Sequence, residues 1–192
     1  MKKLLFFISV LTLGLTACKE SDGTAEEFAD WQNRNETYFE QQYLAHHAAD
    51  IIKKWSVEQT AEVAHTDCIL VDRLATGTGT SSPYYTDTVS VHYRGHLIPS
   101  DSYPAGYEFD KSWEGTFDSA TSIPTKFGVG SGLVLGFSTA LIHMHRGDRW
   151  RVTIPYQLGY GTTAKSTIPA YSTLIFEIEL VDFWSKKKGD RD

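Results

Sequence analysis

Two polar residues occupy positions that packing alone does not explain. Asp110 directly follows an apolar residue in the strand-like stretch Glu108–Asp110, where a carboxylate lowers stability unless it is hydrogen-bonded or serves a function. Tyr160 stands between two glycines. We therefore expect both residues to belong to a functional site in which a few polar groups act within apolar surroundings.

Residue types that often bind metals or act as nucleophiles are poorly placed for either role. His143 and His145 are two residues apart in a helix-like stretch, so their side chains would not face one ion together. No Cys/His cluster in the sequence has the spacing of a zinc site. Cys68 lies in an apolar run and is expected to be a small buried hydrophobic residue. We expect neither a metal nor a cofactor.

The stretch that must position Tyr160 runs from residue 136 to 161. Residues 138–144 are predicted to form a short helix, which ends at a turn where Gly147 can adopt a positive φ. Residues 149–154, after this turn, alternate in the period-two pattern of a half-buried strand, with Trp150, Val152 and Ile154 on the apolar face.

Further period-two stretches predict strands at residues 67–74, 89–97, 108–110, 125–129 and 173–182. In the stretch 89–97, the odd-numbered residues are predicted to be buried, and the exposed face is predicted to carry Ser90, His92, Arg94 and His96. Many strands and one short helix predict an α+β fold, with an antiparallel sheet wrapped around a single helix.

Four blocks of sequence occur in an order that resembles the FKBP-type peptidyl-prolyl cis-trans isomerases. The blocks are VHYRGHL (91–97), EFD (108–110), the stretch 136–161 and IPAYSTLIFEIEL (168–180), and the resemblance covers roughly residues 89–181. It implies a curved antiparallel sheet around one short helix, rotamase activity, and an apolar cup that binds prolyl polypeptides between the sheet and the helix.

The resemblance also implies the residues of this cup. Asp110, Tyr160 and Phe137 would be catalytic: the Tyr160 hydroxyl and the Val134 backbone N–H would hold substrate carbonyls, Phe137 would form the floor, and Asp110 would supply a local dipole. The remaining substrate-binding residues would be Tyr93, Phe109, Val134, Ile168 and Phe176. Tyr93, Phe109 and Phe176 are also expected in the core of any such sheet, because they lie on inward strand faces.

Three departures from the family pattern concern the cup. Phe137 replaces the tryptophan that many members have at the floor, Thr125 falls where a second aromatic residue lines the cup, and the loop 162–167 is shorter and lacks a glycine-proline pair. The connection 98–108 is several residues longer than usual. We expect a wider and shallower cup that keeps activity but binds the family's macrolide inhibitors weakly.

The N-terminus resembles that of a bacterial lipoprotein. Residues 1–17 have a basic start and a short apolar run and are predicted to be a signal peptide. They end at Leu15-Thr16-Ala17-Cys18, which is similar to a lipobox, so Cys18 would carry the lipid. The alternative is an ordinary secretory signal. Lys19 at the second mature position favours the outer membrane, on either its periplasmic or its surface side.

The rest of the chain divides into four predicted segments. Residues 18–24 would be a tether, 25–58 a helical extension, 63–184 the isomerase domain and 185–192 a polar tail. Residues 25–55 contain no Pro or Gly, and their apolar residues recur at mixed spacings of three and four, which predicts one long helix or two abutting helices. This segment would either cover its own domain or form a homodimer.

Composition limits the possible partners. The chain of 192 residues has a net charge of −6 and an isoelectric point near 5.6, without basic blocks between aromatic residues, so we expect no nucleic-acid binding. Together these patterns predict a prolyl isomerase that acts as a folding factor for exported proteins in the bacterial cell envelope. The alternative is a lipid-anchored peptide-binding or chaperone module of the same fold with weak catalysis.

Overall fold

The computed structural model describes residues 27–58 and 60–185, and in them the period-two stretches of the sequence form strands. The strands are β1 (Ile51–Lys53), β2 (Cys68–Ala75), β3 (Thr88–His96), β4 (Glu108–Lys111), β5 (Thr125–Gly128), β6 (Arg149–Ile154) and β7 (Leu174–Trp184). The α-helices are α2 (Trp31–Ala45) and α3 (Leu135–Leu141), and short 3₁₀ helices cover Ala48–Asp50, His65–Asp67 and Tyr156–Leu158. The expected α+β fold is confirmed.

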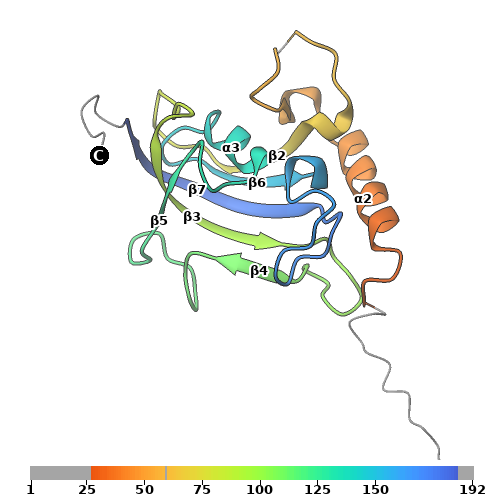
Figure 1. Cartoon of the computed structure of the whole chain (residues 1–192). Helices are drawn as coiled ribbons and strands as arrows, with labels where there is room; N and C mark the ends of the chain where they lie inside the picture. The colour runs from red at the N-terminus through yellow and green to blue at the C-terminus, as the bar shows by residue number, and fades with distance from the viewer. Residues whose placement is uncertain (1–26, 59, 186–192) are drawn as a thin grey trace, which may run out of the picture.

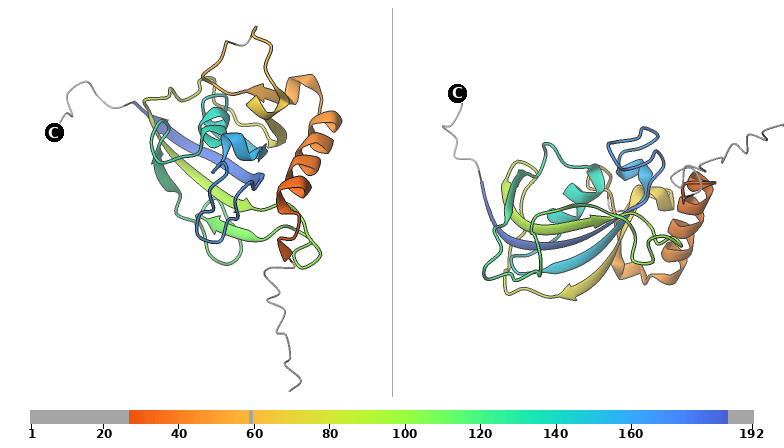
Figure 2. Two further views of the ribbon diagram at one scale, coloured as in Figure 1. Left: turned by 45° about the vertical axis from the view of Figure 1, so that its right-hand side comes forward. Right: turned by 90° about the horizontal axis from the view of Figure 1, so that it is seen from below.

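All strand pairs in the described residues are antiparallel and belong to one sheet. Its order is β1-β2-β6-β7-β3-β4, and β5 pairs with β3 beside this path (Figure 1). The sheet curves around α3, which lies against its concave face, while α2 stands at one end of the sheet (Figure 2). Helix α3 begins three residues earlier than predicted, whereas β6 has its predicted bounds.

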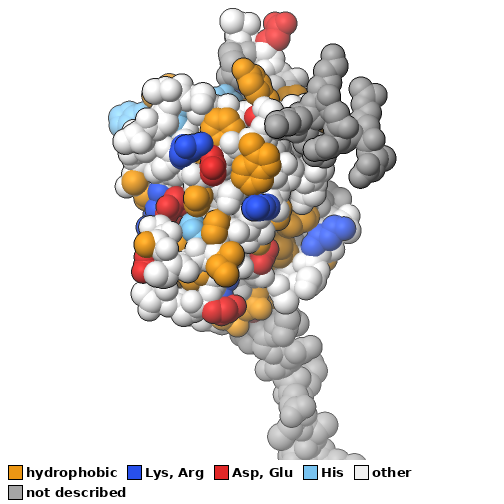
Figure 3. All heavy atoms as spheres, turned by 90° about the vertical axis from the view of Figure 1, so that its left-hand side faces the viewer, with side chains coloured by type: hydrophobic (Ala, Val, Ile, Leu, Met, Phe, Trp, Pro, Cys, Tyr) orange, Lys and Arg blue, Asp and Glu red, His pale blue; other side chains and the backbone are white. Residues whose placement is uncertain are grey.

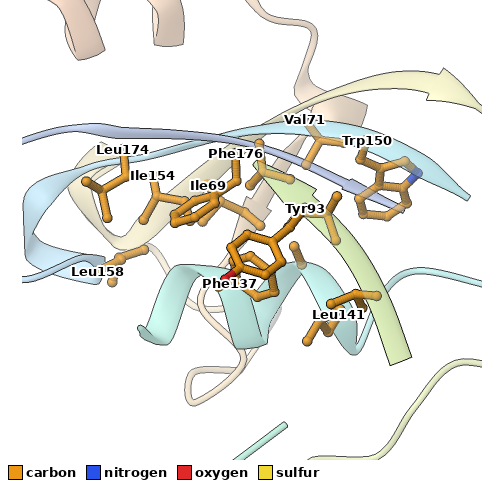
Figure 4. Close-up of a cluster of buried hydrophobic side chains, with 14 of the residues drawn as sticks. Ile69, Val71, Tyr93, Phe137, Leu141, Trp150, Ile154, Leu158, Leu174 and Phe176 are labelled. Atoms are coloured by element: carbon orange, nitrogen blue, oxygen red, sulfur yellow. The ribbon is translucent and has the colours of Figure 1, made fainter. Parts of the chain in front are cut away.

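The core lies between α3 and the concave face of the sheet. Figure 4 shows Phe137 and Leu141 of α3 in one cluster with apolar side chains of the strands. The buried cluster includes Ile69, Val71, Val89, Val91, Trp150, Val152, Ile154, Leu174 and Ile178. Successive residues of a strand face opposite sides of the sheet, so the apolar residues at alternate positions of these strands form one continuous core.

The N-terminal segment is only partly helical, so the prediction of helix through residue 55 is wrong beyond Ala45. Residues 51–53 form β1, which pairs with β2 through Ile51 opposite Leu70 and Lys53 opposite Cys68. Isoleucine favours strands where it can pack on a pleated surface. The sheet therefore begins before residue 63, where the sequence suggested that the isomerase domain starts.

Helix α2 is attached to the chain just ahead of β7. The indole Nε1 of Trp31 donates a hydrogen bond of 2.9 Å to the hydroxyl of Ser172. Asn35 is completely buried, donates to the carbonyl of Trp31 and accepts a 2.8 Å hydrogen bond from the backbone N–H of Thr173. Phe39, which is 2% exposed, completes the buried side of the helix. The helix thus covers its own domain through Trp31, Asn35 and Phe39.

Strand β3 is covered on both faces, contrary to the prediction that its even-numbered residues are exposed. Ser90 and His92 are 6% and 2% exposed, respectively. The rings of Trp113 and Phe117, in the connection between β4 and β5, pack edge-on against His92 at 6.5 and 5.1 Å between ring centroids. Burial lowers the pKa of His92, although the charge of Glu179 opposes this. The long β4–β5 connection therefore acts as a cover for the outer face of the sheet.

A second cluster on the outer face of the sheet is ionic. Glu177 on β7 lies opposite Arg94 on β3 and Arg151 on β6, and it also bonds Arg149, with nitrogen–oxygen distances of 2.9 to 3.2 Å. Burial alone would raise the pKa of Glu177, but hydrogen bonds from these arginines lower it to about 2. The cluster thus stabilises the ionised carboxylate.

This cluster predicts a specific pH dependence of stability. Since the pKa of Glu177 is lowered on folding, its contribution is present above its ordinary pKa near 4.5 and is lost as the pH falls towards 2. The contribution is at most about 3 kcal/mol, and screening at the half-exposed arginines reduces it to roughly 1–2 kcal/mol. Urea unfolding of the parent and of Glu177→Gln at pH 7 and pH 3 checks this, because the stability difference between them should shrink at the lower pH. An equal difference at both pH values would contradict it.

Several sequence-based expectations fall outside the described residues. These are the signal peptide 1–17, lipidation at Cys18, the tether 18–24 and nearly all of the tail 185–192. Within the described ranges, neither helix combines the length and apolar character needed to span a bilayer.

Candidate functional site

A small cup opens between the N-terminal end of α3 and the concave face of the sheet. Its volume is about 90 Å³. The lining residues are Tyr93, Asp110, Phe127, Gly132, Leu133, Val134, Phe137, Tyr160 and Phe176. Drug-sized ligands usually occupy pockets of roughly 300–1,000 Å³. The cup is therefore suited to a single ring or side chain.

Phe137 is the floor of the cup and the centre of an aromatic cluster. It projects from the first turn of α3 and is only 2% exposed. Its ring meets Phe176 at 5.0 Å and 87°, and Tyr93 at 6.0 Å and 88°, between ring centroids. Figure 4 shows the Tyr93 ring directly beside Phe137. Such edge-to-face contacts hold each ring in a defined orientation, so the floor is rigid.

Asp110 occupies the rim of the cup. Its Oδ2 accepts a 2.9 Å hydrogen bond from the Tyr93 hydroxyl, and its Oδ1 accepts one from the backbone N–H of Lys111. The residue is exposed, and these hydrogen bonds meet the condition under which a carboxylate beside apolar residues does not lower stability. Burial raises the pKa of Tyr93 and the bond to Asp110 raises it further, which keeps the hydroxyl protonated as a donor at neutral pH.

Two groups at the cup can donate to a ligand. The Tyr160 hydroxyl has no hydrogen-bond partner within the described chain, and its residue is 38% exposed. Burial raises the pKa of Tyr160, as does the negative charge of Asp110, so the hydroxyl is protonated at neutral pH. Val134 immediately precedes α3, and its backbone N–H likewise makes no hydrogen bond to the residues that the structure describes.

The cup brings together six of the eight residues expected from sequence. Phe109 lies behind the lining, with its ring edge-on to Phe176 at 5.4 Å and over Gly95. Ile168 is buried and lines a larger neighbouring groove. Thr125 does not line the cup either.

The lining also contains three residues that the sequence interpretation missed, namely Phe127, Gly132 and Leu133. Phe127 lies two residues after Thr125 on β5 and shares its face of the strand. The period-two pattern of the sequence was therefore sufficient to place Phe127 on the same side of the strand as Thr125.

The chemistry available in the cup is binding and orientation. No group of three or more His, Cys, Asp or Glu side chains in the described ranges is arranged to hold a metal ion. His143 bonds the carbonyl of Thr139, whereas His145 faces Asp148, so the two histidines point to different neighbours. Burial raises the pKa of the Cys68 thiol, which makes it a poor nucleophile.

Comparisons with known proteins agree with this geometry. The sequence profile of the FKBP-type peptidyl-prolyl cis-trans isomerases matches residues 79–181, more than half of the chain. The macrophage infectivity potentiator of Trypanosoma cruzi is 37% identical over 122 residues, which cover 63% of this chain and 56% of that protein. The FKBP-type 22 kDa peptidyl-prolyl cis-trans isomerase of Escherichia coli is 41% identical over 101 residues, or 52% of this chain and 43% of that protein.

The fold is also found among solved structures. The peptidyl-prolyl cis-trans isomerase of Pseudomonas syringae superimposes with a TM-score of 0.58 at 26% identity, covering 83% of this chain and 96% of that one. The chain spans about half the length of the two sequence relatives above. The matched region nevertheless includes β3 to β6 and nearly all of β7, and with them the whole cup. The chain therefore belongs to the FKBP-type peptidyl-prolyl cis-trans isomerase family.

Proposed function

We propose that this protein is a peptidyl-prolyl cis-trans isomerase that assists the folding of exported proteins in the bacterial cell envelope. The observation that carries the proposal is the apolar cup, with Phe137 at its floor and the bonded pair Tyr93 and Asp110 at its rim. Because the chain belongs to the FKBP-type family, the cup is most directly interpreted as the site that binds a prolyl residue.

The reaction requires no covalent chemistry. Rotation about an Xaa-Pro bond has a barrier near ~20 kcal/mol because the twisted amide loses its resonance. The twisted amide is less charge-separated than the planar one, so an apolar cup that excludes water binds it in preference. In this mechanism the proline ring lies on Phe137, and the free donors of Tyr160 and Val134 hold carbonyls on either side of the bond.

A protease-coupled isomerisation assay on the parent, Tyr160→Phe and Asp110→Val tests this function. Tyr160→Phe removes one hydroxyl, so it should lower kcat/KM by about five- to a hundredfold, which corresponds to roughly 1–3 kcal/mol of transition-state binding. Its melting temperature should hardly change. Tyr84→Phe is the matched control, because Tyr84 is 73% exposed and lies outside the cup.

Asp110→Val should also lower turnover, and it should lower stability slightly. The nearly buried Tyr93 hydroxyl would lose its acceptor, which costs about 1 kcal/mol. A small decrease in melting temperature is therefore expected. Unchanged rates in both variants would exclude the proposed roles of these residues.

The second candidate is a peptide-binding or chaperone module with weak catalysis. The small cup supports it, because binding an extended prolyl segment requires the same surface. A parent protein that binds prolyl peptides in the cup without accelerating isomerisation would identify this function.

The envelope location depends on the N-terminus. We propose that Cys18 is lipidated after removal of residues 1–17, as the sequence Leu-Thr-Ala-Cys indicates, and that Lys19 directs the protein to the outer membrane. Mass spectrometry of the membrane fraction should find acyl groups on a peptide that begins at Cys18. An intact Met1 terminus would contradict this, and an unmodified soluble form would favour an ordinary secretory signal.

On the surface, hydrophobic side chains and charges of both signs are interspersed over the face that carries β5 and the end of β7 (Figure 3). This face therefore offers no extended basic area of the kind that nucleic-acid binding requires. The proposed partners are instead prolyl polypeptides.

A further inference from the structure

A groove of about 600 Å³ lies beside the start of the described chain and has no role in the function proposed above. Three segments form it: residues 27–28, the β3–β4 connection and the loop before β7. In Figure 1 the three segments lie near one another, beside and below the start of α2. The lining residues are Glu27, Phe28, Ser102, Tyr103, Tyr107, Ala164, Ser166, Thr167, Ile168 and Pro169.

The groove and the cup are bounded by the same two elements. The segment that enters β4 contributes Tyr107 to the groove and Asp110 to the cup. The loop before β7 contributes Tyr160 to the cup and Ile168 to the groove. Tyr107 and Asp110 are three residues apart, which is roughly 10 Å in an extended segment. A polypeptide with its proline in the cup thus reaches the groove with a side chain two to four residues away.

The loop before β7 is held in shape by its own hydrogen bonds. Lys165 and Ile168 exchange two bonds of 2.8 Å, and the N–H of Tyr171 donates to the carbonyl of Gly161 at 2.9 Å. This wall of the groove is therefore preformed.

The opposite wall comes from the unusually long β3–β4 connection. Ser100 and Gly106 each donate a backbone hydrogen bond to the carbonyl of Tyr103, at 3.0 and 2.8 Å. Gly106 has φ near +83°, and a side chain there would collide with the carbonyl of Leu97. The rings of Tyr103 and Tyr107 meet edge to face at 5.1 Å, so this wall is ordered as well.

The chemistry of the walls favours an apolar occupant. Two tyrosine rings, Phe28, Ile168 and Pro169 supply aromatic and aliphatic surface, and Tyr103 is 42% exposed. Glu27 adds a negative charge, and hydrogen bonds from Ser100 and Ser102 hold its pKa below the usual range. An acidic side chain would be repelled there.

We propose that this groove is a second subsite for the substrate, which takes a bulky apolar or aromatic side chain two to four residues from the proline. The inference rests on the proposed prolyl-peptide function of the cup. It implies that the protein selects its clients by a residue beyond those that contact the cup.

Direct binding of labelled peptides tests the subsite independently of catalysis. The probes are fluorescein-labelled peptides of about nine residues, long enough at roughly 3.3 Å per residue to span both sites, with a central proline. They carry Phe, Ala or Glu at positions two to four on either side. At one of these positions, the parent should bind the Phe peptide about tenfold more tightly than the Ala peptide, and the Glu peptide least tightly.

Two groove variants and one control complete the experiment. Ala164→Trp fills the groove from an exposed loop position and Tyr103→Ala removes part of a wall, so each should abolish the preference for Phe over Ala. Tyr84→Ala removes an exposed tyrosine outside the groove and should retain it. A parent without the preference, or a preference that survives both groove variants, overturns the subsite.

The outcomes also separate the subsite from the proposed function. A parent that isomerises prolyl peptides but shows no preference for Phe refutes only the subsite. A parent that shows the preference without accelerating isomerisation supports the subsite and refutes the enzyme.

Discussion

A variant that begins at Val63 should fail to fold, or should melt far below the parent, because residues before this point belong to the core. Trp31 and Phe39 are 7% and 2% exposed, and truncating a buried aromatic residue typically costs about 3–5 kcal/mol. Two such losses approach the whole stability of a domain, roughly 5–15 kcal/mol. The deletion also removes β1, the edge partner of β2. Circular dichroism melting of this variant beside one that begins at Ala25 measures the effect.

A point substitution isolates the part of this effect that is due to α2. Asn35→Ala leaves the buried N–H of Thr173 without an acceptor and should cost about 2–3 kcal/mol. Asn33→Ala on the exposed side of the same helix is the matched control, with an expected cost below ~0.5 kcal/mol. Equal melting temperatures for the Val63 and Ala25 variants would instead restore the interpretation of residues 25–58 as a separate extension.

The same helix influences the cup through the chain ahead of β7. Its bonds to Ser172 and Thr173 anchor the end of the loop that carries Tyr160 and Ile168. Loss of α2 should therefore disturb ligand binding as well as stability.

The fold could be predicted from sequence wherever the pattern is local. The alternation of apolar residues in β6 depends only on neighbours in the chain, and its bounds Arg149–Ile154 were predicted correctly. The identity of Ile51–Lys53 as a strand depends on pairing with β2, which lies some fifteen residues later and is invisible to periodicity. The cover over His92 was missed for the same reason, since Trp113 and Phe117 come from an irregular connection.

The candidate site could likewise be predicted only in part from the sequence. The resemblance to the FKBP-type family was sufficient to select six of the cup's lining residues. The exposure of Asp110 and its bond to Tyr93 could not be predicted, because they depend on the position of β4 at the edge of the sheet. Likewise, Ile168 faces a groove built by residues 27–28 and by an unusually long connection, neither of which follows from the family pattern.

Phe137→Ala should produce the largest effect of any single substitution in the cup, on stability and on catalysis together. The ring is almost fully buried against Tyr93, Phe127 and Phe176, so its removal should cost about 3–5 kcal/mol. The substrate would also lose the flat apolar floor on which its proline ring rests. We expect kcat/KM to fall by more than about tenfold, which requires only ~1.4 kcal/mol of lost transition-state binding.

A second substitution on the same helix, which also leaves a cavity in the core, separates the effect on stability from the effect on catalysis. Leu141 is completely buried one turn along α3 and does not line the cup, so Leu141→Ala should cost a comparable 2–5 kcal/mol. Isomerase rates are compared near ~10 °C, where the uncatalysed reaction takes minutes, and are corrected for the folded fraction from urea unfolding. Per folded molecule, Leu141→Ala should retain its rate while Phe137→Ala loses it. If both variants lose rate to the same extent, Phe137 supports the core without acting on the substrate.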